Sequence, residues 1–347
     1  MSEKNNSSIV SKDPRSLWTK FMSLNGSSIL LATIAAFILF EIALHIKSPE
    51  AGGLLFMTPA NLMLILRQQV YIGLIAFGLT LVMLTGNIDL SVGNMLTFLC
   101  CVCAVIMMNT DNALLGVLGT LAAGALCGLF NGVLVSYVKL NSFITTLGAS
   151  SIFFALALRV SAGSILVLDA NSSQAFQNLG KLSFFGGNVH ILIVWFVVVA
   201  VVLGLVLSRT VYGQQLYAIG ANPVAARFSG IRYKRNITIA YVVTGLCAGL
   251  AAVVNMANTL SANPQSGSNK EMEVILCVVL GGCAINGGKG SVWGTVIGVL
   301  FYGVLSAGFT SLALSQYLQW VIMGAIMMVI LSLSALKERG IKLWKRK

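Results

Sequence analysis

Long apolar runs recur from one end of this chain to the other, and they constrain its fold more than any other feature. A helix needs about 20 apolar residues to cross the hydrocarbon core of a membrane. Only 9% of the 347 residues are charged, whereas soluble proteins carry about 25%. The pattern predicts an all-α polytopic membrane protein with ten segments, near 27–46, 68–85, 91–108, 113–138, 143–162, 189–207, 237–257, 274–284, 291–313 and 317–336.

The first and the eighth runs differ from the others. Run 27–46 contains Glu41 and lacks a small-residue cleavage site, so we predict a retained span rather than a signal peptide. We expect Glu41 to face protein or water, because an ionised side chain is costly in lipid. Run 274–284 is too short to cross a membrane alone. It is expected to be a half-helix, unless the helix extends toward Glu271.

Positive charges are distributed unevenly along the chain, whose net charge is +12. With a cytoplasmic amino terminus, ten crossings place 17 of the 22 Lys and Arg residues on the cytoplasmic side, four on the other side and Arg159 within a span. The positive-inside rule describes such a bias. We predict a transmembrane domain at 27–336 between cytoplasmic tails at 1–26 and 337–347. Lipid contact accounts for the excess charge, so we expect no nucleic-acid partner.

Patterns typical of catalytic and metal sites are missing from the sequence. The seven cysteines lie in or beside apolar runs without metal-site spacing, and the two histidines are far apart. A Gly-x4-Gly-Lys-Ser/Thr loop, which cradles nucleotide phosphates in many ATPases, does not occur. We predict a non-enzymatic chain with no metal and no cofactor of its own.

A polar segment at 208–235 interrupts the apolar runs on the side predicted to be cytoplasmic. Within it, Asn222 suits an N-cap, Pro223 suits the first helical position, and Gly230 suits the end of a short helix. Gly220 is expected to allow a sharp turn into this helix. The sequence thus predicts a helix of about two turns across the end of the bundle.

Two roles for this short helix remain open from the residues alone. Ala225 and Ala226 keep its surface low, which lets another surface approach closely. Arg227 and Phe228 supply a charge and an aromatic side chain, and both types are enriched at protein interfaces. The helix either rests on lipid or docks a cytoplasmic partner.

Two glycine-rich breaks interrupt the helical pattern, LTGNIDLSVGNM at 84–95 and LGGCAINGGKGSVWG at 280–294. Each has a Ser-Val pair near glycine and leads into an apolar run, which suggests a weak internal repeat. Broken helices at matching positions of two halves are typical of a translocation path. Asp89 is predicted either to cap the following helix together with Ser91, or to act as a gate or as a partner for a basic group.

Four stretches carry a resemblance to a known family, in this order: GNIDLSVGNML at 86–96, GLFNGVLVSYVKLNSFITTLG at 128–148, YAIGANPVAARFSGI at 217–231 and VLGGCAINGGKGSVWGTVIGVL at 279–300. They resemble the sugar-type permease subunits of bacterial ABC importers, a group that includes the ribose, xylose, galactose and autoinducer-2 permeases. The resemblance covers most of the chain, from about Asn61 to Leu336.

This resemblance implies a type II ABC importer-like permease in the bacterial inner membrane. Two permease copies or paralogues would form the pore, cytoplasmic ATPase subunits would hydrolyse ATP, and an extracytoplasmic sugar-binding protein would deliver the solute. The segment 208–235 resembles the coupling loop of the family. Its residues at the ATPase contact would be Gly220, Asn222, Ala225, Ala226, Arg227, Phe228, Ser229 and Gly230.

The same resemblance suggests a path for a small neutral solute such as a monosaccharide or a related sugar. The loop 164–188 is predicted to contact the binding protein or to form a folded cap over the pore. Many relatives have an Arg-Gly pair where this chain has Phe154–Ala155, and this departure leaves the substrate open. Candidate path or gating residues are Asp89, Ser91, Asn131, Asn141 and Thr145.

Other transport classes remain as alternatives. A nucleoside or branched-chain amino acid ABC permease is one, because those groups are related. A stand-alone secondary transporter is another, and it would need ionisable residues for a coupling ion at mid-membrane. The sequence shows no obvious charged pair there, so we expect a pore wall of small, apolar and mildly polar residues.

Overall fold

The computed structural model describes residues 27–48, 53–169, 173–184 and 189–338. Residues 1–26 and 339–347, which hold nearly all of the two predicted tails, lie outside the described part. Within the described part, eight helices are long and apolar enough to cross a membrane. They are α2 (Ser27–Lys47), α3 (Pro59–Leu84), α4 (Val92–Thr110), α5 (Ala113–Ser136), α6 (Ser142–Val160), α8 (Ile191–Arg209), α11 (Tyr233–Thr259) and α13 (Val292–Ser311). The predicted all-α polytopic fold is confirmed.

Further helices and short strands complete the described chain. The helices are α7 (Gln174–Lys181), α9 (Val211–Ala221), α10 (Pro223–Phe228), α12 (Lys270–Leu280) and α14 (Gln316–Glu338). The strands form two antiparallel pairs, β1 (Leu166–Val167) with β4 (Ser261–Ala262) and β2 (Ser183–Phe184) with β3 (Val189–His190). Every predicted apolar segment thus coincides with a helix, the ninth and tenth being α13 and α14.

Some helices begin earlier than the approximate predicted boundaries, α3 most of all. α3 begins at Pro59 rather than near residue 68, because the Thr58 side chain caps it by accepting the N–H of Asn61 over 3.2 Å. The polar residues at 67–69 hid this first part of the helix. α12 spans Lys270–Leu280 rather than 274–284. The expected half-helix is therefore present, and it extends beyond Glu271.

The centre of the bundle is formed by α11 packed against α3, α4 and α5. α5 and α11 approach closely, because a Cβ at Gly124 would collide with the backbone of Gly245 and a Cβ at Gly128 with the carbonyl of Tyr241. The Gly-x-x-x-Gly spacing of Gly124 and Gly128 is typical of such helix contacts. This close contact holds the inner residues of α5 in fixed positions.

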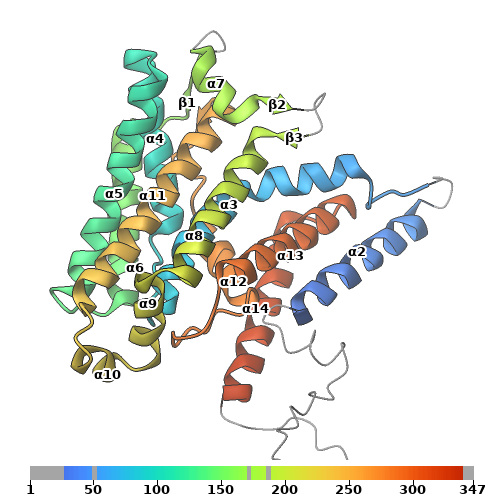
Figure 1. The fold of residues 1–347 in the computed structure, drawn as a ribbon. Helices are drawn as coiled ribbons and strands as arrows, with labels where there is room; N and C mark the ends of the chain where they lie inside the picture. The colour runs from blue at the N-terminus through green and yellow to red at the C-terminus, as the bar shows by residue number, and fades with distance from the viewer. Residues whose placement is uncertain (1–26, 49–52, 170–172, 185–188, 339–347) are drawn as a thin grey trace, which may run out of the picture.

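α2 lies at the edge of the bundle beside α13 (Figure 1). The rings of Phe40 and Phe309 join the two helices, with their centroids 5.6 Å apart. Glu41 is only 9% exposed, and its carboxylate accepts the N–H groups of residues 55–57 over 2.7–2.9 Å. Glu41 therefore faces protein, as expected.

The two ends of the bundle differ. Figure 1 shows α9 and α10 at one end and α7 with β1, β2 and β3 at the other, where β4 pairs with β1; we name these the α10 end and the α7 end. α7 packs against α11, and the Trp195 Nε1–H of α8 donates to the carbonyl of Leu179 over 3.2 Å. The described part of the loop 164–188 is thus folded onto the bundle, while residues 170–172 and 185–188 lie outside the description.

Candidate coupling face and transport path

α10 is built as the sequence rules predict. Asn222 Oδ1 accepts the N–H groups of Val224 and Ala225, each over 3.0 Å. Pro223 occupies the first helical position, Ser229 is the C-cap, and Gly230 follows with a φ of +77°. The predicted short helix, capped by Asn222 and starting at Pro223, is confirmed, and it ends at Phe228, one residue before the predicted Ser229.

The surface of α10 carries one prominent aromatic side chain. Phe228 is 88% exposed, whereas Ala226 is buried against the bundle. The Arg227 guanidinium lies 4.1 Å from the centroid of the Tyr233 ring at the start of α11, a cation–π contact that orients it. α10 therefore exposes the Phe228 ring and holds the Arg227 charge in a fixed orientation, while Ala226 packs against the bundle.

Gly220 does not form the sharp turn that was expected. It lies inside α9, and a Cβ there would collide with the carbonyl of Leu84 and with the N–H of Gly288. Only glycine lets α9 approach these two backbones so closely. The Tyr217 hydroxyl adds a hydrogen bond of 2.8 Å to the carbonyl of Gly290. α9 thus rests directly on both glycine-rich breaks.

The two breaks also contact each other. Gly288 donates its N–H to the carbonyl of Leu84 over 2.9 Å. Each break leads into a helix whose N-cap position is a serine, Ser91 for α4 and Ser291 for α13. The Ser291 side chain caps its helix by accepting the N–H of Gly294 over 3.0 Å. The breaks, α9 and α10 therefore form one connected layer at the α10 end.

Asp89 joins two other predicted path residues in a buried cluster. Its Oδ1 accepts the N–H of Ser91 over 2.9 Å and the hydroxyl of Ser91 over 2.6 Å. Asn131 Nδ2 donates to the Ser91 hydroxyl oxygen over 2.8 Å. All three residues are fully buried. Ser91 occupies the predicted N-cap position of α4, but its side chain does not cap the helix, because it donates to Asp89 instead.

Burial sets the protonation chemistry of this cluster. Asp89 lies in the connection between α3 and α4, and burial raises the pKa of its carboxyl. The hydrogen bonds from Ser91 and Asn131 lower that pKa by a smaller amount. A raised pKa favours the neutral form of a carboxyl group. Asp89 therefore fits a closed, hydrogen-bonded cluster better than a charged gate exposed to water.

The remaining two predicted path residues lie at the start of α6, outside the cluster. Asn141 caps α6, with its Oδ1 accepting the N–H of Phe143 over 2.9 Å. The Thr145 hydroxyl donates to the carbonyl of Asn141 over 2.8 Å. Asn141 also lines a basic pocket of about 830 Å³ at the α10 end. Its cationic residues are Lys139, Arg227, Arg232, Lys234 and Arg235.

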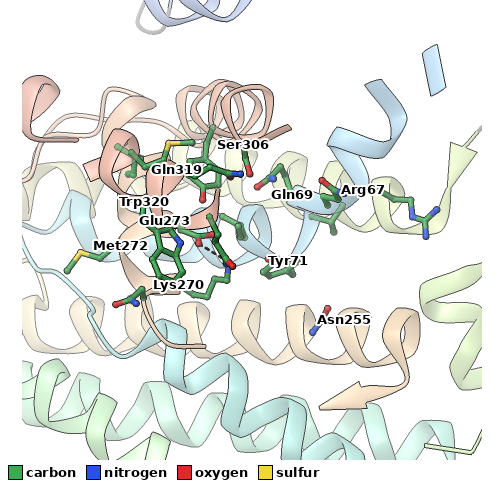
Figure 2. Close-up of a pocket in the computed structure, with 18 of the residues that line it drawn as sticks. Arg67, Gln69, Tyr71, Asn255, Lys270, Met272, Glu273, Ser306, Gln319 and Trp320 are labelled. Atoms are coloured by element: carbon green, nitrogen blue, oxygen red, sulfur yellow. Dashed lines mark hydrogen bonds and ion pairs between the residues drawn. The ribbon is translucent and has the colours of Figure 1, made fainter. Parts of the chain in front are cut away.

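A separate cavity of about 690 Å³ lies between α3, α11, α12, α13 and α14, and it contains none of the predicted path residues. Figure 2 shows its polar centre, where Lys270 and Glu273 lie between Trp320 and Tyr71. Amide side chains from three helices also line it: Gln69 from α3, Asn255 from α11 and Gln319 from α14.

α12 places the charged centre of this cavity deep in the bundle. With 11 residues it is about 16 Å long, roughly half of a 30 Å hydrocarbon core. Its last residues adjoin the breaks at the α10 end, where a Cβ at Gly281 would collide with Gly294. Because the breaks lie at the α10 end of the spans, we infer that the first turn of α12 lies near mid-depth. The irregular segment before it packs through Gly267 against Gly93 of α4, as membrane-depth irregular backbone requires.

Lys270 and Glu273 form an ion pair in the first turns of α12. Lys270 Nζ lies 2.8 Å and 2.9 Å from the two Glu273 oxygens, and the side chains are 27% and 20% exposed. The sequence shows no obvious charged pair at mid-membrane, whereas the structure brings Lys270 and Glu273 together inside the bundle. The sequence placed Lys270 outside the predicted span and left Glu273 either before the span or in a helix extended toward Glu271; the signal for the pair was the acidic first turn of an unusually short helix.

Comparisons with known proteins agree with this architecture. The family model described as "Branched-chain amino acid transport system / permease component" matches residues 61–331. The chain is 36% identical to the ribose import permease protein RbsC of Bacillus subtilis (strain 168), over 82% of this chain and 87% of the relative. It is 32% identical to the D-allose transport system permease protein AlsC of Escherichia coli (strain K12), over 92% of both chains.

A third relative extends the match toward both ends of the chain. The galactose/methyl galactoside import permease protein MglC of Escherichia coli (strain K12) is 30% identical over 91% of this chain and 95% of the relative. No solved structure matches the chain with significance. The matched span of 61–331 runs from α3 into α14 and so includes α10, both glycine-rich breaks and the half-helix α12. The chain therefore belongs to this permease-component family and is a transmembrane permease subunit of an ABC importer.

Proposed function

We propose that the chain carries a monosaccharide or a related sugar across the bacterial inner membrane. The observation that carries this proposal is the agreement between relatives named for ribose, D-allose and galactose import, each matching at least 82% of the chain. The 690 Å³ cavity supports it, because its lining offers hydrogen-bond donors, acceptors and aromatic faces. Such a lining suits a neutral solute with several hydroxyl groups.

We place the α10 end in the cytoplasm, where an ATPase subunit would dock on α10. The segment from α8 to α11 carries five of the basic residues, Arg209, Arg227, Arg232, Lys234 and Arg235, as the positive-inside rule favours for that side. Both chain termini then lie in the cytoplasm. A reporter that is active only in the cytoplasm, fused after Lys347, tests this orientation, and activity of an exported reporter at the same position contradicts it.

Coupling then follows the contacts of the α10 end. ATP binding would bring two ATPase subunits together, and each would move α10 as a rigid body. Asn222 ends α9 and caps α10, so the two helices move together. Gly220 of α9 packs against both glycine-rich breaks, and the second break directly follows α12. The ATPase drives transport only if it binds one of the resulting states more tightly.

In this scheme the cluster of Asp89, Ser91 and Asn131 closes the path at the α10 end, and Asn141 and Thr145 flank it at the start of α6. An extracytoplasmic binding protein delivers the sugar at the α7 end. The partners are thus two permease subunits, their ATPases and the binding protein. The permease itself needs no cofactor.

The test is uptake by cells that express the chain with its ATPase and binding protein. Labelled D-ribose, D-allose and D-galactose are offered separately, and leucine is the competing substrate because of the family description. We expect ATP-dependent uptake of at least one sugar and none of leucine. Uptake of leucine alone would replace this proposal with the amino acid alternative.

A further inference from the structure

An ion pair that faces a cavity at mid-depth of a membrane protein requires an explanation. Charged side chains in this region are costly and are usually tied to a solute or ion path. Lys270 and Glu273 are neither fully buried nor fully exposed, at 27% and 20%, and both line the 690 Å³ cavity. Their shared place in the first turns of a half-helix is the arrangement in which broken helices of transporters hold solutes.

The pair retains hydrogen-bonding capacity after its own contact is made. An ammonium has three N–H donors, and a carboxylate has about four acceptor positions. Lys270 Nζ contacts both Glu273 oxygens, and the hydroxyls of Tyr71 and Tyr302, which line the same cavity, lie beside Lys270 and Glu273. Solute hydroxyl groups that take the place of these tyrosine hydroxyls can accept from Lys270 and donate to Glu273 at the same time.

The groups around the pair fit the rest of a sugar. Trp320 is 53% exposed on the cavity side of α14, and the ring of Tyr317 holds it edge-on at 5.9 Å and 88°. A flat aromatic face suits the apolar face of a sugar ring. Gln69 contributes a buried Oε1 that has no hydrogen-bond partner among the described residues. Figure 2 shows Trp320 and Gln69 on the same side of the cavity as the pair.

We infer that Lys270, Glu273 and Trp320 form a hydroxyl-binding station for the transported sugar, half-way through the permease. This inference rests on the proposed function and names its binding residues. Glu273 accepts from one hydroxyl, Lys270 donates to its neighbour, and the ring lies on Trp320. The volume lies within the usual range of small-molecule sites. A solute must also leave, so binding is weak, with a Kd on the order of millimolar.

The full-length protein in lipid nanodiscs, without binding protein, tests the station directly. D-ribose, D-allose and D-galactose are titrated into it separately while tryptophan emission is recorded, with betaine at equal osmolality as the control. We expect a saturable change with at least one of the sugars that the cells take up. Trp320→Phe abolishes the change, whereas Trp293→Phe on α13, outside the cavity lining, leaves it intact.

Charge variants then test the pair. Lys270→Gln combined with Glu273→Gln removes both charges without leaving an unpaired one, and it weakens the sugar Kd about tenfold or more. The matched control is Glu271→Gln, the same change in the same helix but outside the cavity lining, which leaves Kd unchanged; its Tm is recorded as well, because Glu271 Oε2 is buried without a partner among the described residues. If the double variant fails to insert, Glu273→Asp takes its place. It keeps both charges but shortens the acidic side chain, so it must also weaken the binding of the sugar.

The outcomes distinguish a failure of the proposed binding site from a failure of the proposed function. Sugar uptake by cells with no emission change in the nanodiscs overturns the station and leaves the proposed function standing. A change that survives Trp320→Phe, or a Kd that the pair variants do not alter, also overturns the station. Failure of the complete importer to take up any of the three sugars instead rejects the proposed function.

Discussion

Gly288 donates its N–H to the carbonyl of Leu84 over 2.9 Å, so the chain that leaves α12 is fastened to the last turn of α3. Gly220 of α9 packs onto both of these backbones. Three segments far apart in sequence therefore meet at one point, directly behind α10. Any force applied to α10 reaches the two glycine-rich breaks through this contact.

Gly220→Ala should weaken this contact. The added methyl group would overlap the Leu84 carbonyl and the Gly288 amide, and overpacking of this kind costs about 1–3 kcal/mol. Gly148→Ala in α6 is the matched control, because a Cβ there meets nothing within 4 Å, and the helix gains about 0.5–1 kcal/mol. Thermal unfolding in detergent measures both. An unchanged Tm for Gly220→Ala contradicts the close contact.

Arg227→Glu should separate ATPase docking from folding. The change leaves the Asn222 cap and Pro223 in place, so the protein still inserts. It reverses a charge at the proposed ATPase contact and loses the Tyr233 stacking, so a few kcal/mol, or on the order of a hundredfold in association, should be lost. Recovery of the ATPase by pull-down at matched membrane expression measures this. A helix that rests on lipid loses only about 1 kcal/mol of surface attraction and leaves recovery intact.

Asp89→Asn should change how stability depends on pH. Burial raises the pKa of the Asp89 carboxyl, so the folded protein binds this proton more tightly than the unfolded chain. The free energy of unfolding is then highest below the ordinary Asp pKa of about 3.9 and falls as pH rises to the folded pKa. Asn cannot titrate, so the variant loses this part of the slope. Denaturant unfolding across pH compares the two proteins, and equal slopes contradict the assignment.

Asp89→Ala provides the contrast at the same position. It leaves the donors of Ser91 and Asn131 without their buried acceptor, which costs about 1–3 kcal/mol. Asp89→Asn keeps an acceptor oxygen there. Asn should therefore be the better tolerated substitution, as measured by Tm and by recovery from membranes.

The loop 164–188 should contact the binding protein. Lys181 at the end of α7 is exposed at the α7 end, and its Nζ donates to Gln177 Oε1 over 3.0 Å. A photo-crosslinker in place of Lys181 should capture the binding protein, whereas one in place of Lys139 at the α10 end should not. Lys181→Glu should change the docking rate and its salt dependence more than stability. Absence of crosslinks from several positions of this loop contradicts the contact.

Local rules were sufficient where the structure is local. The cap, the first proline and the terminal glycine of α10 follow from residues 222–230 alone, because a short helix is specified by its own ends. The apolar runs predicted the membrane helices in the same way, because each run is a property of its own residues. Gly220 shows the limit of such rules, because its neighbours Leu84 and Gly288 are far away in the sequence. A glycine that permits a turn and one that permits a close approach look alike in a sequence.

The cavity shows the larger gap between sequence and structure. Lys270 follows a polar stretch, and polar stretches between apolar runs usually lie at a membrane surface. Its real depth depends on Gly267 packing against Gly93, a tertiary contact with no local signature. Trp320 and Tyr71 reach the same cavity from α14 and α3, which only the assembled bundle brings together.

The short length of α12 also has an electrical consequence. Water in a cavity that reaches Lys270 would carry the electrical potential of the compartment at the α7 end to mid-depth. The membrane voltage would then drop mainly between the first turn of α12 and the α10 end. A unit charge crossing that half would still meet nearly the whole voltage, about 2.3 kcal/mol per 100 mV, within half the distance. An uncharged sugar feels none of this field. With water in the cavity, the broken helix would concentrate the field that ions meet into half of the membrane.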